Sequence, residues 1–345
     1  MRNISISPII ILVLISVFCI ANGSSGSRIL ISPDGCSYET VHVNEQKNWY
    51  KLYKHNLYSK SKVLYNLKQN TGNCGIGVAS LDTQGSKLAL SGSCIINTVP
   101  KNSYRIYRLV IVDRKNNKEI AKFNNAHLFC FSPEGDGIVF NEDIFGERGT
   151  PPPPDFKEGI WIYYFKSGQK IELKGIPQYI IDVNWSDHDG NIYIAGYDKV
   201  VQYDVAKRAS KIVPYKGIYF SKDGKYYANK TTENSLSGIY RTSDNAEMVQ
   251  WEKMVEEAGN SRQLNLVFVS KELNAFIFYF GVTSGGINNV IFGLRQEKVI
   301  GQFEGLVVGT NADGTLVQVY PMKKDGSGGY DMSRIEIIDL TKFKK

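Results

Sequence analysis

Short runs of apolar and aromatic residues alternate with tight turns along this chain. Six of the turns carry a common signal, in which polar and acidic residues lead to a glycine. Such turns join two short strands into a hairpin. A seventh turn, at residues 268–274, keeps the apolar flanks but lacks the glycine. The six glycine turns are Ile31-Ser32-Pro33-Asp34-Gly35, Leu81-Asp82-Thr83-Gln84-Gly85, Phe131-Ser132-Pro133-Glu134-Gly135, Trp185-Ser186-Asp187-His188-Asp189-Gly190, Phe220-Ser221-Lys222-Asp223-Gly224 and Asn311-Ala312-Asp313-Gly314.

Each hairpin is followed by a second recurring half. An apolar strand ends in an acidic residue, and a polar turn and a shorter strand follow, as in Ile106–Val112 with Asp113 or Val200–Tyr203 with Asp204. Four short strands repeated every 34 to 55 residues or so predict an all-β fold, a β-propeller with four-stranded antiparallel blades. Seven hairpins predict seven blades. Six blades is the alternative count, because little chain remains after the last second half.

The repeats resemble those of a known family. Phe131-Ser132-Pro133-Glu134-Gly135 resembles the Ser-Pro-Asp-Gly turn of WD-repeat and TolB-type (WD40-like) propellers, and Tyr203-Asp204 stands where a WD dipeptide would. The stretch from Asn141-Glu142-Asp143 to Gly159-Ile160-Trp161 resembles the TolB-type repeat. The resemblance covers residues 28 to about 343 and implies a propeller. It implies no particular activity, because propellers host many functions.

One segment departs from the repeats. Residues 245–258 place Met248, Trp251, Met254 and Val255 at roughly helical spacing. A cap at Ser243 or Asp244 would suit a helix start there. The sequence therefore predicts a short amphipathic helix that packs on the propeller or docks a partner.

The N-terminus predicts export. Arg2 precedes an almost wholly apolar run, Pro8 to Ile20, and small residues that fit a cleavage site follow. We assign residues 1–21 to a signal peptide, 22–27 to a short linker and 28–345 to a single propeller domain, and we expect a secreted or periplasmic protein. No later segment approaches the 18 apolar residues of a membrane span. The net charge of +7 is scattered, and export argues against nucleic acid as a partner.

Four cysteines follow the signal segment: Cys36, Cys74, Cys94 and Cys130. Cys74 and Cys94 flank one predicted hairpin, within one position of facing each other. A bulge would bring them together, so we predict a disulfide between them, which an exported protein permits. Cys130 falls in a predicted inner strand and reads as a small core residue.

No catalytic motif is evident, and the sequence assigns no catalytic residue, cofactor or metal. The four histidines lie in different repeats, and His188 falls in a turn where we expect it to be exposed. The chain reads as an exported propeller that acts as a binding scaffold for a protein or cell-surface partner. The alternative is an exported propeller enzyme, a lyase or glycan-acting hydrolase with its site in the axial funnel.

Long predicted loops, such as Asn141–Glu158 and Pro321–Ser333, are the expected contact surface, since a rigid scaffold positions such loops for binding. Aromatic and arginine residues anchor interfaces. The candidate contact residues are Phe145, Arg148, Lys323, Lys324 and Tyr330.

Overall fold

A computed structural model describes most of the predicted strands. The described residues are 29–31, 37–44, 49–56, 62–68, 74–98, 102–116, 118–124, 126–142, 144–146, 159–177, 180–229, 238–248, 264–281, 287–310, 314–323, 329–331 and 336–343. Only the backbone is described before Ser80 and at residues 92–108. The predicted signal peptide and linker lie outside this part of the chain. Among the described residues, no helix is long and apolar enough to cross a membrane.

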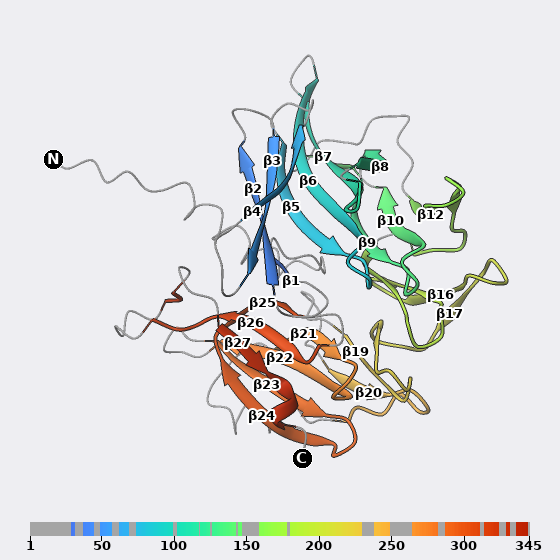
Figure 1. Ribbon diagram of the computed structural model, residues 1–345. Helices are drawn as coiled ribbons and strands as arrows, with labels where there is room; N and C mark the ends of the chain where they lie inside the picture. Colours follow the sequence, from blue (N-terminus) through green and yellow to red (C-terminus); the bar gives the residue numbers. More distant parts are fainter. Residues whose placement is uncertain are drawn as a thin grey trace. The chain divides into compact units, whose positions relative to one another are not determined.

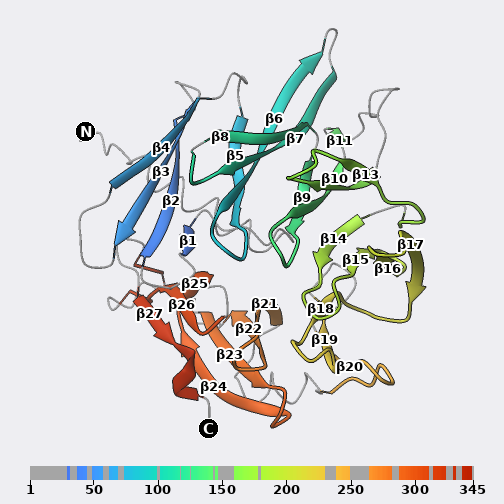
Figure 2. The ribbon, with the colours of Figure 1, turned by 45° about the vertical axis from the view of Figure 1, so that its right-hand side comes forward.

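The described residues form seven antiparallel sheets, which confirms the all-β prediction and the four-stranded unit (Figures 1 and 2). The first four sheets contain β1 Ile29–Ile31, β2 Ser37–Asn44, β3 Trp49–Asn56 and β4 Lys62–Lys68; β5 Cys74–Leu81, β6 Lys87–Thr98, β7 Asn102–Asp113, β8 Lys118–Asn124 and β11 Ile144–Gly146; β9 Ala126–Phe131, β10 Gly137–Glu142, β12 Gly159–Tyr164 and β13 Lys170–Glu172; and β14 Ile180–Trp185, β15 Ile192–Gly196, β16 Val200–Asp204 and β17 Ala209–Val213.

Two of the last three sheets have three described strands. They contain β18 Tyr219–Phe220, β19 Tyr226–Ala228 and β20 Ile239–Arg241; β21 Leu264–Ser270, β22 Ala275–Gly281, β23 Ile287–Gly293 and β24 Lys298–Glu304; and β25 Leu306–Thr310, β26 Leu316–Tyr320 and β27 Glu336–Asp339, after which a short 3-10 helix runs over Leu340–Phe343. The chain divides into two compact units, of which the second comprises residues 31–36, 130–139 and 160–345. Closure into a propeller and the single-domain assignment remain predictions.

The predicted glycine turns connect the first two strands of their sheets. Gly85, Gly135, Gly190, Gly224 and Gly314 all adopt positive φ between 65° and 71°, which L-residues other than glycine rarely adopt. In the turn without glycine, Asn274 takes this role with φ 48°. Asparagine tolerates the left-handed region better than most residues, so the seventh turn keeps its shape.

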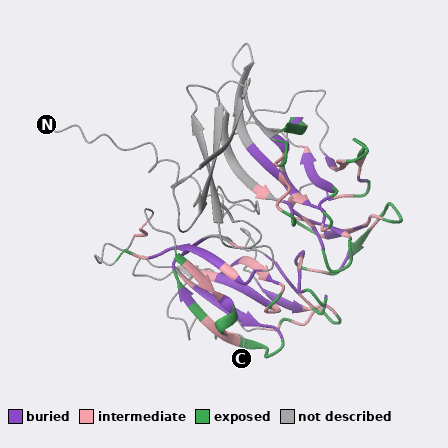
Figure 3. Cartoon of the chain, viewed as in Figure 1, coloured by how far each residue is buried: buried purple, intermediate pink, exposed green. Residues whose placement is uncertain are grey.

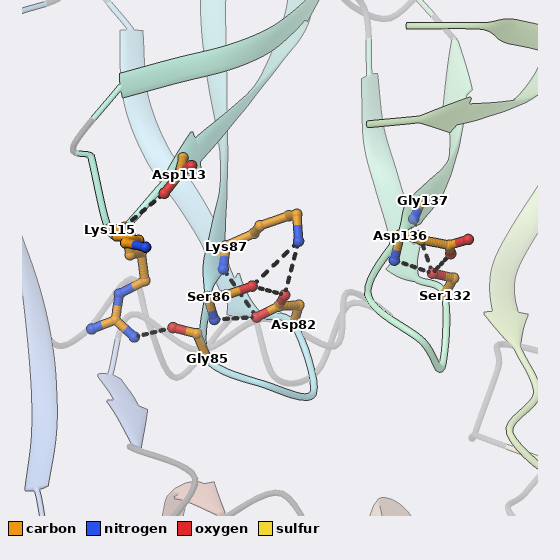
Figure 4. A network of polar contacts seen from close by, with 10 residues as sticks. Asp82, Gly85, Ser86, Lys87, Asp113, Lys115, Ser132, Asp136 and Gly137 are labelled. Carbon is orange, nitrogen blue, oxygen red and sulfur yellow. Dashed lines mark hydrogen bonds and ion pairs between the residues drawn. The ribbon is translucent and has the colours of Figure 1, made fainter. Parts of the chain in front are cut away.

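A short polar side chain is buried at the start of five of these turns. The Asp82 carboxylate accepts hydrogen bonds from the backbone N–H of Ser86 (2.6 Å) and Lys87 (3.0 Å). The Ser132 hydroxyl accepts them from Asp136 and Gly137, both at 3.0 Å (Figure 4). These side chains replace water for backbone groups that the turn leaves unpaired. The five residues are 3% exposed or less: Asp82, Ser132, Ser186, Ser221 and Ser270.

The recurring acidic residue at the end of the third strand also holds a turn. The Asp113 carboxylate accepts the backbone N–H of Lys115 at 2.8 Å (Figure 4), and that of Asp204 accepts the N–H of Lys207 at 2.9 Å. Hydrogen bonds from the backbone of Asn116 and Lys207 lower the pKa of Asp113 and Asp204, respectively. The acidic residue at the position that resembles the WD dipeptide therefore stabilises the turn between the third and fourth strands of its own sheet.

In the second unit, successive sheets pack face to face through apolar side chains. One cluster joins Tyr193 of β15 to Tyr227 of β19, and the next joins Ala228 to Phe276 and Phe278 of β22. A third cluster joins Ile277 of β22 to Val317 and Val319 of β26. Figure 3 shows the buried residues following the strands. Phe276 and Phe278 are fully buried, and burial of a phenylalanine contributes about 1.5–3 kcal/mol.

The prediction of a helix at residues 245–258 is wrong for the described part, residues 245–248. Asn245 has φ 56°, and Glu247 forms an antiparallel bridge with Tyr240, so the chain turns back on β20. Asp244 does not cap a helix: its carboxylate accepts the N–H of Ala246 within this turn. Residues 249–258 lie outside the described residues.

Candidate functional site

The second unit contains an open pocket of about 680 Å³ beside the β12–β13 turn. We call it the turn pocket. Its sides come from three turns that belong to two neighbouring sheets, β9–β10–β12–β13 and β14–β17. The side chains used below are Asp136, Tyr164, Lys166, Gln169, Val205 and Arg208.

Backbone hydrogen bonds fix the first wall of the turn pocket. The N–H of Phe165 donates to the carbonyl of Asp136 at 2.9 Å, which joins the β9–β10 turn to the end of β12. The N–H of Gly168 donates to the carbonyl of Tyr164, also at 2.9 Å, and closes the turn that carries Lys166. The Asp136 carboxylate accepts the Ser132 hydroxyl at 2.6 Å. Lys166 and Asp136 therefore project from tight turns whose backbones are held in place.

The opposite wall is the β16–β17 turn, which carries two cations, Lys207 and Arg208, in different environments. Lys207 is paired with Asp204 at 3.1 Å, whereas Arg208, among the described residues, forms no ion pair. Arg208 also adopts φ 53°. Left-handed backbone costs a residue with a side chain roughly 1–2 kcal/mol, and the β12–β13 turn uses glycine, Gly168, with φ 67°. The strained position thus holds a charged side chain against the pocket.

The electrostatics of the turn pocket are mixed. Burial raises the pKa of the Tyr164 phenol and the Asp136 carboxylate raises it further, while the Arg208 guanidinium opposes the shift. Tyr164 therefore keeps its proton at neutral pH and remains a hydrogen-bond donor. Lys166 and Arg208 supply two positive charges against the single negative charge of Asp136. The pocket therefore suits a ligand with an anionic group, which the two cations and the Tyr164 hydroxyl can bind, and with a hydrogen-bond donor that faces Asp136.

A second polar feature runs along the first strands of three successive sheets. We call it the inner-strand row; it comprises Cys130 of β9, Asp182 and Asn184 of β14 and Tyr219 of β18. The Tyr219 hydroxyl donates to the Asp182 carboxylate, whose other oxygen accepts the N–H of Val183 at 2.9 Å. The Asn184 amide donates to the carbonyl of Ile218 at 2.8 Å.

The inner-strand row ties its own strands together. Burial, and then the charge of Asp182, raise the pKa of the Tyr219 phenol well above its ordinary value. The Cys130 thiol is half-buried and lies 3.8 Å from the Asn184 amide oxygen. The one carboxylate of the row is engaged by Tyr219 and by the backbone. Among the described residues, no group of three or more His, Cys, Asp or Glu side chains is placed to hold a metal.

The structure brings two of the predicted contact residues together. Met322, next to Lys323, forms a bridge with Tyr330, and the N–H of Lys323 donates to the carbonyl of Gly329 at 2.8 Å. Lys323 is exposed, whereas Tyr330 is half-buried, which raises the pKa of its phenol to about 12.

The other predicted contact residues are less well placed. Phe145 lies on β11, where its backbone pairs with Arg105 of β7, so this part of the predicted loop is a strand. Arg148 and Lys324 lie outside the described residues. The sequence analysis missed the turn pocket, because its residues come from separate turns of ordinary polar composition.

The predicted cysteine pair faces across one hairpin. Cys74 of β5 is the register partner of Cys94 of β6, and a bulge between Ile76 and Val78 sets this register. Directly opposed residues on antiparallel strands have Cα atoms about 4.5–5.5 Å apart, within the range that a disulfide spans. The register meets the backbone requirement, and the bond itself remains a prediction.

Comparison with known proteins finds similar chains among solved structures but not among family models or curated proteins. No family model and no curated protein matches the chain. The chain is similar to TolB from Acinetobacter baumannii at 13% identity and a TM-score of 0.43, over 78% of this chain and 63% of that chain. The match thus spans less than two thirds of TolB. The all-β architecture stands on the sheet topology of the chain itself.

Proposed function

We propose that this chain is an exported β-propeller scaffold that binds a protein or cell-surface partner. Seven sheets with a recurring four-strand unit support closure into seven blades, and the last four of them stack in sequence order within the second unit. Export rests on the apolar segment near the N-terminus. The same proposal holds that the chain after the signal peptide does not span a membrane and does not bind nucleic acid.

The turn pocket is the observation that carries the binding role. It presents two cations, Arg208 and Lys166, against the single carboxylate of Asp136, beside the protonated phenol of Tyr164. Arginine and tyrosine dominate the binding energy of interfaces because they combine apolar area with directed hydrogen bonds. An open pocket on rigid turns suits recognition of a surface group. The carboxylate of the inner-strand row is engaged, so that row supports no acid–base role.

Crosslinking capture from the host's extracellular fraction tests the proposal. The wild-type chain is compared with a double variant, Lys166→Glu with Arg208→Glu, and with the matched control Lys211→Glu. Lys211 is an exposed cation on β17 outside the pocket. We expect a defined partner that the wild type and the control capture and the double variant loses. Equal capture by all three proteins, or no partner for any of them, contradicts the proposed function.

A further inference from the structure

We infer that the turn pocket binds the carboxylate of an acidic saccharide, a sugar ring that carries a uronate group. The inference rests on the proposed function and specifies its ligand. It uses four side chains of the pocket: Lys166, Arg208, Tyr164 and Asp136.

The positive side of the pocket selects a carboxylate. Lys166 and Arg208 extend from turns of two neighbouring sheets, and neither forms an ion pair with a described residue. A guanidinium binds a carboxylate through parallel N–H bonds, and an ammonium adds a point charge. The Tyr164 phenol, held in its protonated form, adds a neutral donor. One carboxylate can accept hydrogen bonds from all three groups.

The negative side selects hydroxyl groups. Asp136 lines the same pocket, and its carboxylate would repel a ligand that offers only negative charge. A carboxylate accepts hydrogen bonds, so Asp136 and the amide oxygen of Gln169 suit ring hydroxyls. A uronate sugar carries its carboxylate and hydroxyls on one ring. The carboxylate of an acidic peptide brings no hydroxyl to Asp136.

The shape of the pocket fits the same ligand. The pocket is open, and Val205 and Ala206 contribute apolar surface to its lining. A large apolar ligand would stay mostly in water there, whereas a sugar ring keeps its outer hydroxyls solvated.

Titration calorimetry with trigalacturonate tests the inference, with its methyl ester as the matched neutral probe. We expect the acid to bind and the ester to bind at least tenfold more weakly. Arg208→Gln and Lys166→Gln should each weaken trigalacturonate binding about tenfold or more, because each removes a charged hydrogen bond. Lys211→Gln should leave binding unchanged. Thermal melts of each variant show that the fold is kept.

A peptide probe separates the two kinds of acidic ligand. We expect triglutamate to bind the wild type more weakly than trigalacturonate, and Asp136→Ala to narrow this gap by removing the repulsion and the hydroxyl acceptor. Tighter binding of triglutamate, equal binding of acid and ester, or binding that Arg208→Gln leaves unchanged overturns the inference. If no saccharide binds while partner capture still depends on Lys166 and Arg208, the inference fails and the proposed function stands.

Discussion

The imidazole of His188 lies directly against Gly224, so the glycine turn of one sheet rests on that of the next. His188 is exposed, as the sequence analysis expected, and yet it fills the space where a Cβ of residue 224 would lie. The same arrangement recurs between the last two sheets, where a Cβ at Gly314 would come within 2.8 Å of Ser270. Asp187, next to His188, and Lys271, next to Ser270, form an ion pair of 2.5 Å between their two turns. The turns of the second unit thus pack on one another.

Gly224→Ala should destabilise the protein more than Gly190→Ala. Both glycines have positive φ, 66° and 71°, but a Cβ at Gly190 meets nothing within 4 Å. We expect Gly190→Ala to cost about 1 kcal/mol for the backbone alone. We expect Gly224→Ala to cost about 2–4 kcal/mol, because it adds a clash with His188. Chemical denaturation measures both free energies.

His188→Ala provides the internal control. In the Gly224→Ala background it should remove the clash and restore the stability lost to it, leaving only the backbone cost of about 1 kcal/mol. Strictly additive effects of the two substitutions would show that His188 does not occupy this space in solution.

The turns also show how far the sequence predicts this fold. Glycine, and the buried Asp or Ser before it, act within a few residues, so the hairpins could be recognised without knowledge of the tertiary structure. Asn274 fits the same rule, since its backbone takes the glycine conformation. The predicted helix failed because apolar spacing at 245–258 carries no information about the bridge from Glu247 back to Tyr240. That bridge depends on a partner strand, which periodicity does not show.

Arg208 should be a position where stability and binding conflict. Its φ of 53° favours glycine, so Arg208→Gly should be more stable than Arg208→Ala by about 1 kcal/mol. The alanine variant removes the guanidinium and keeps the backbone strain, which isolates the effect of φ. Thermal and chemical denaturation of the two variants gives the difference. Equal stability would mean that the turn relaxes to another conformation.

Cys74 and Cys94 should form a disulfide in the exported protein. The bond would close a loop of about 20 residues and stabilise the fold by about 3 kcal/mol. Digestion without reduction, followed by mass spectrometry, should give a linked peptide that disappears on reduction. Cys130 provides a comparison, because it lies on β9, outside this hairpin, and should be alkylated after denaturation without reduction. Alkylation of Cys74 and Cys94 in the same sample contradicts the bond.

The candidate site was harder to predict than the fold, for a physical reason. Lys166 and Arg208 are 42 positions apart and belong to different sheets, so only the packing of those sheets brings them to one pocket. Lysine and arginine are common in turns, and neither position stands out in the sequence. The Cys74–Cys94 register could be anticipated to within one residue, because both cysteines lie on one hairpin. Contacts inside a hairpin follow from chain geometry, whereas contacts between sheets do not.

Tyr193→Phe should reduce stability at neutral pH and have less effect in acid. Burial would raise the pKa of Asp189, but hydrogen bonds from Tyr193 (2.7 Å) and Asn191 outweigh it, so the pKa is lowered. A carboxyl group with a lowered pKa contributes stability above its unfolded pKa of about 4, and this is lost as pH falls through the folded pKa. We expect a loss of about 1 kcal/mol at pH 7, allowing for the partial exposure of Asp189. Denaturation at several pH values measures it, and a loss that persists unchanged in strong acid would assign the effect to packing.

Two buried amides should respond in opposite ways to replacement by leucine. Asn289 is fully buried, and its amide nitrogen donates to the carbonyls of Phe303 at 3.2 Å and Gly305 at 2.7 Å. Asn289→Leu leaves both carbonyls without that donor and should cost about 2–4 kcal/mol. Gln318 is 1% exposed, and neither polar atom of its amide has a hydrogen-bond partner among the described residues. Gln318→Leu replaces an unsatisfied amide with an apolar side chain of similar volume, so the free energy of unfolding should stay the same or rise. Denaturation of both variants under identical conditions decides the point, and a large loss for Gln318→Leu would mean that the amide is satisfied in solution by a bound water.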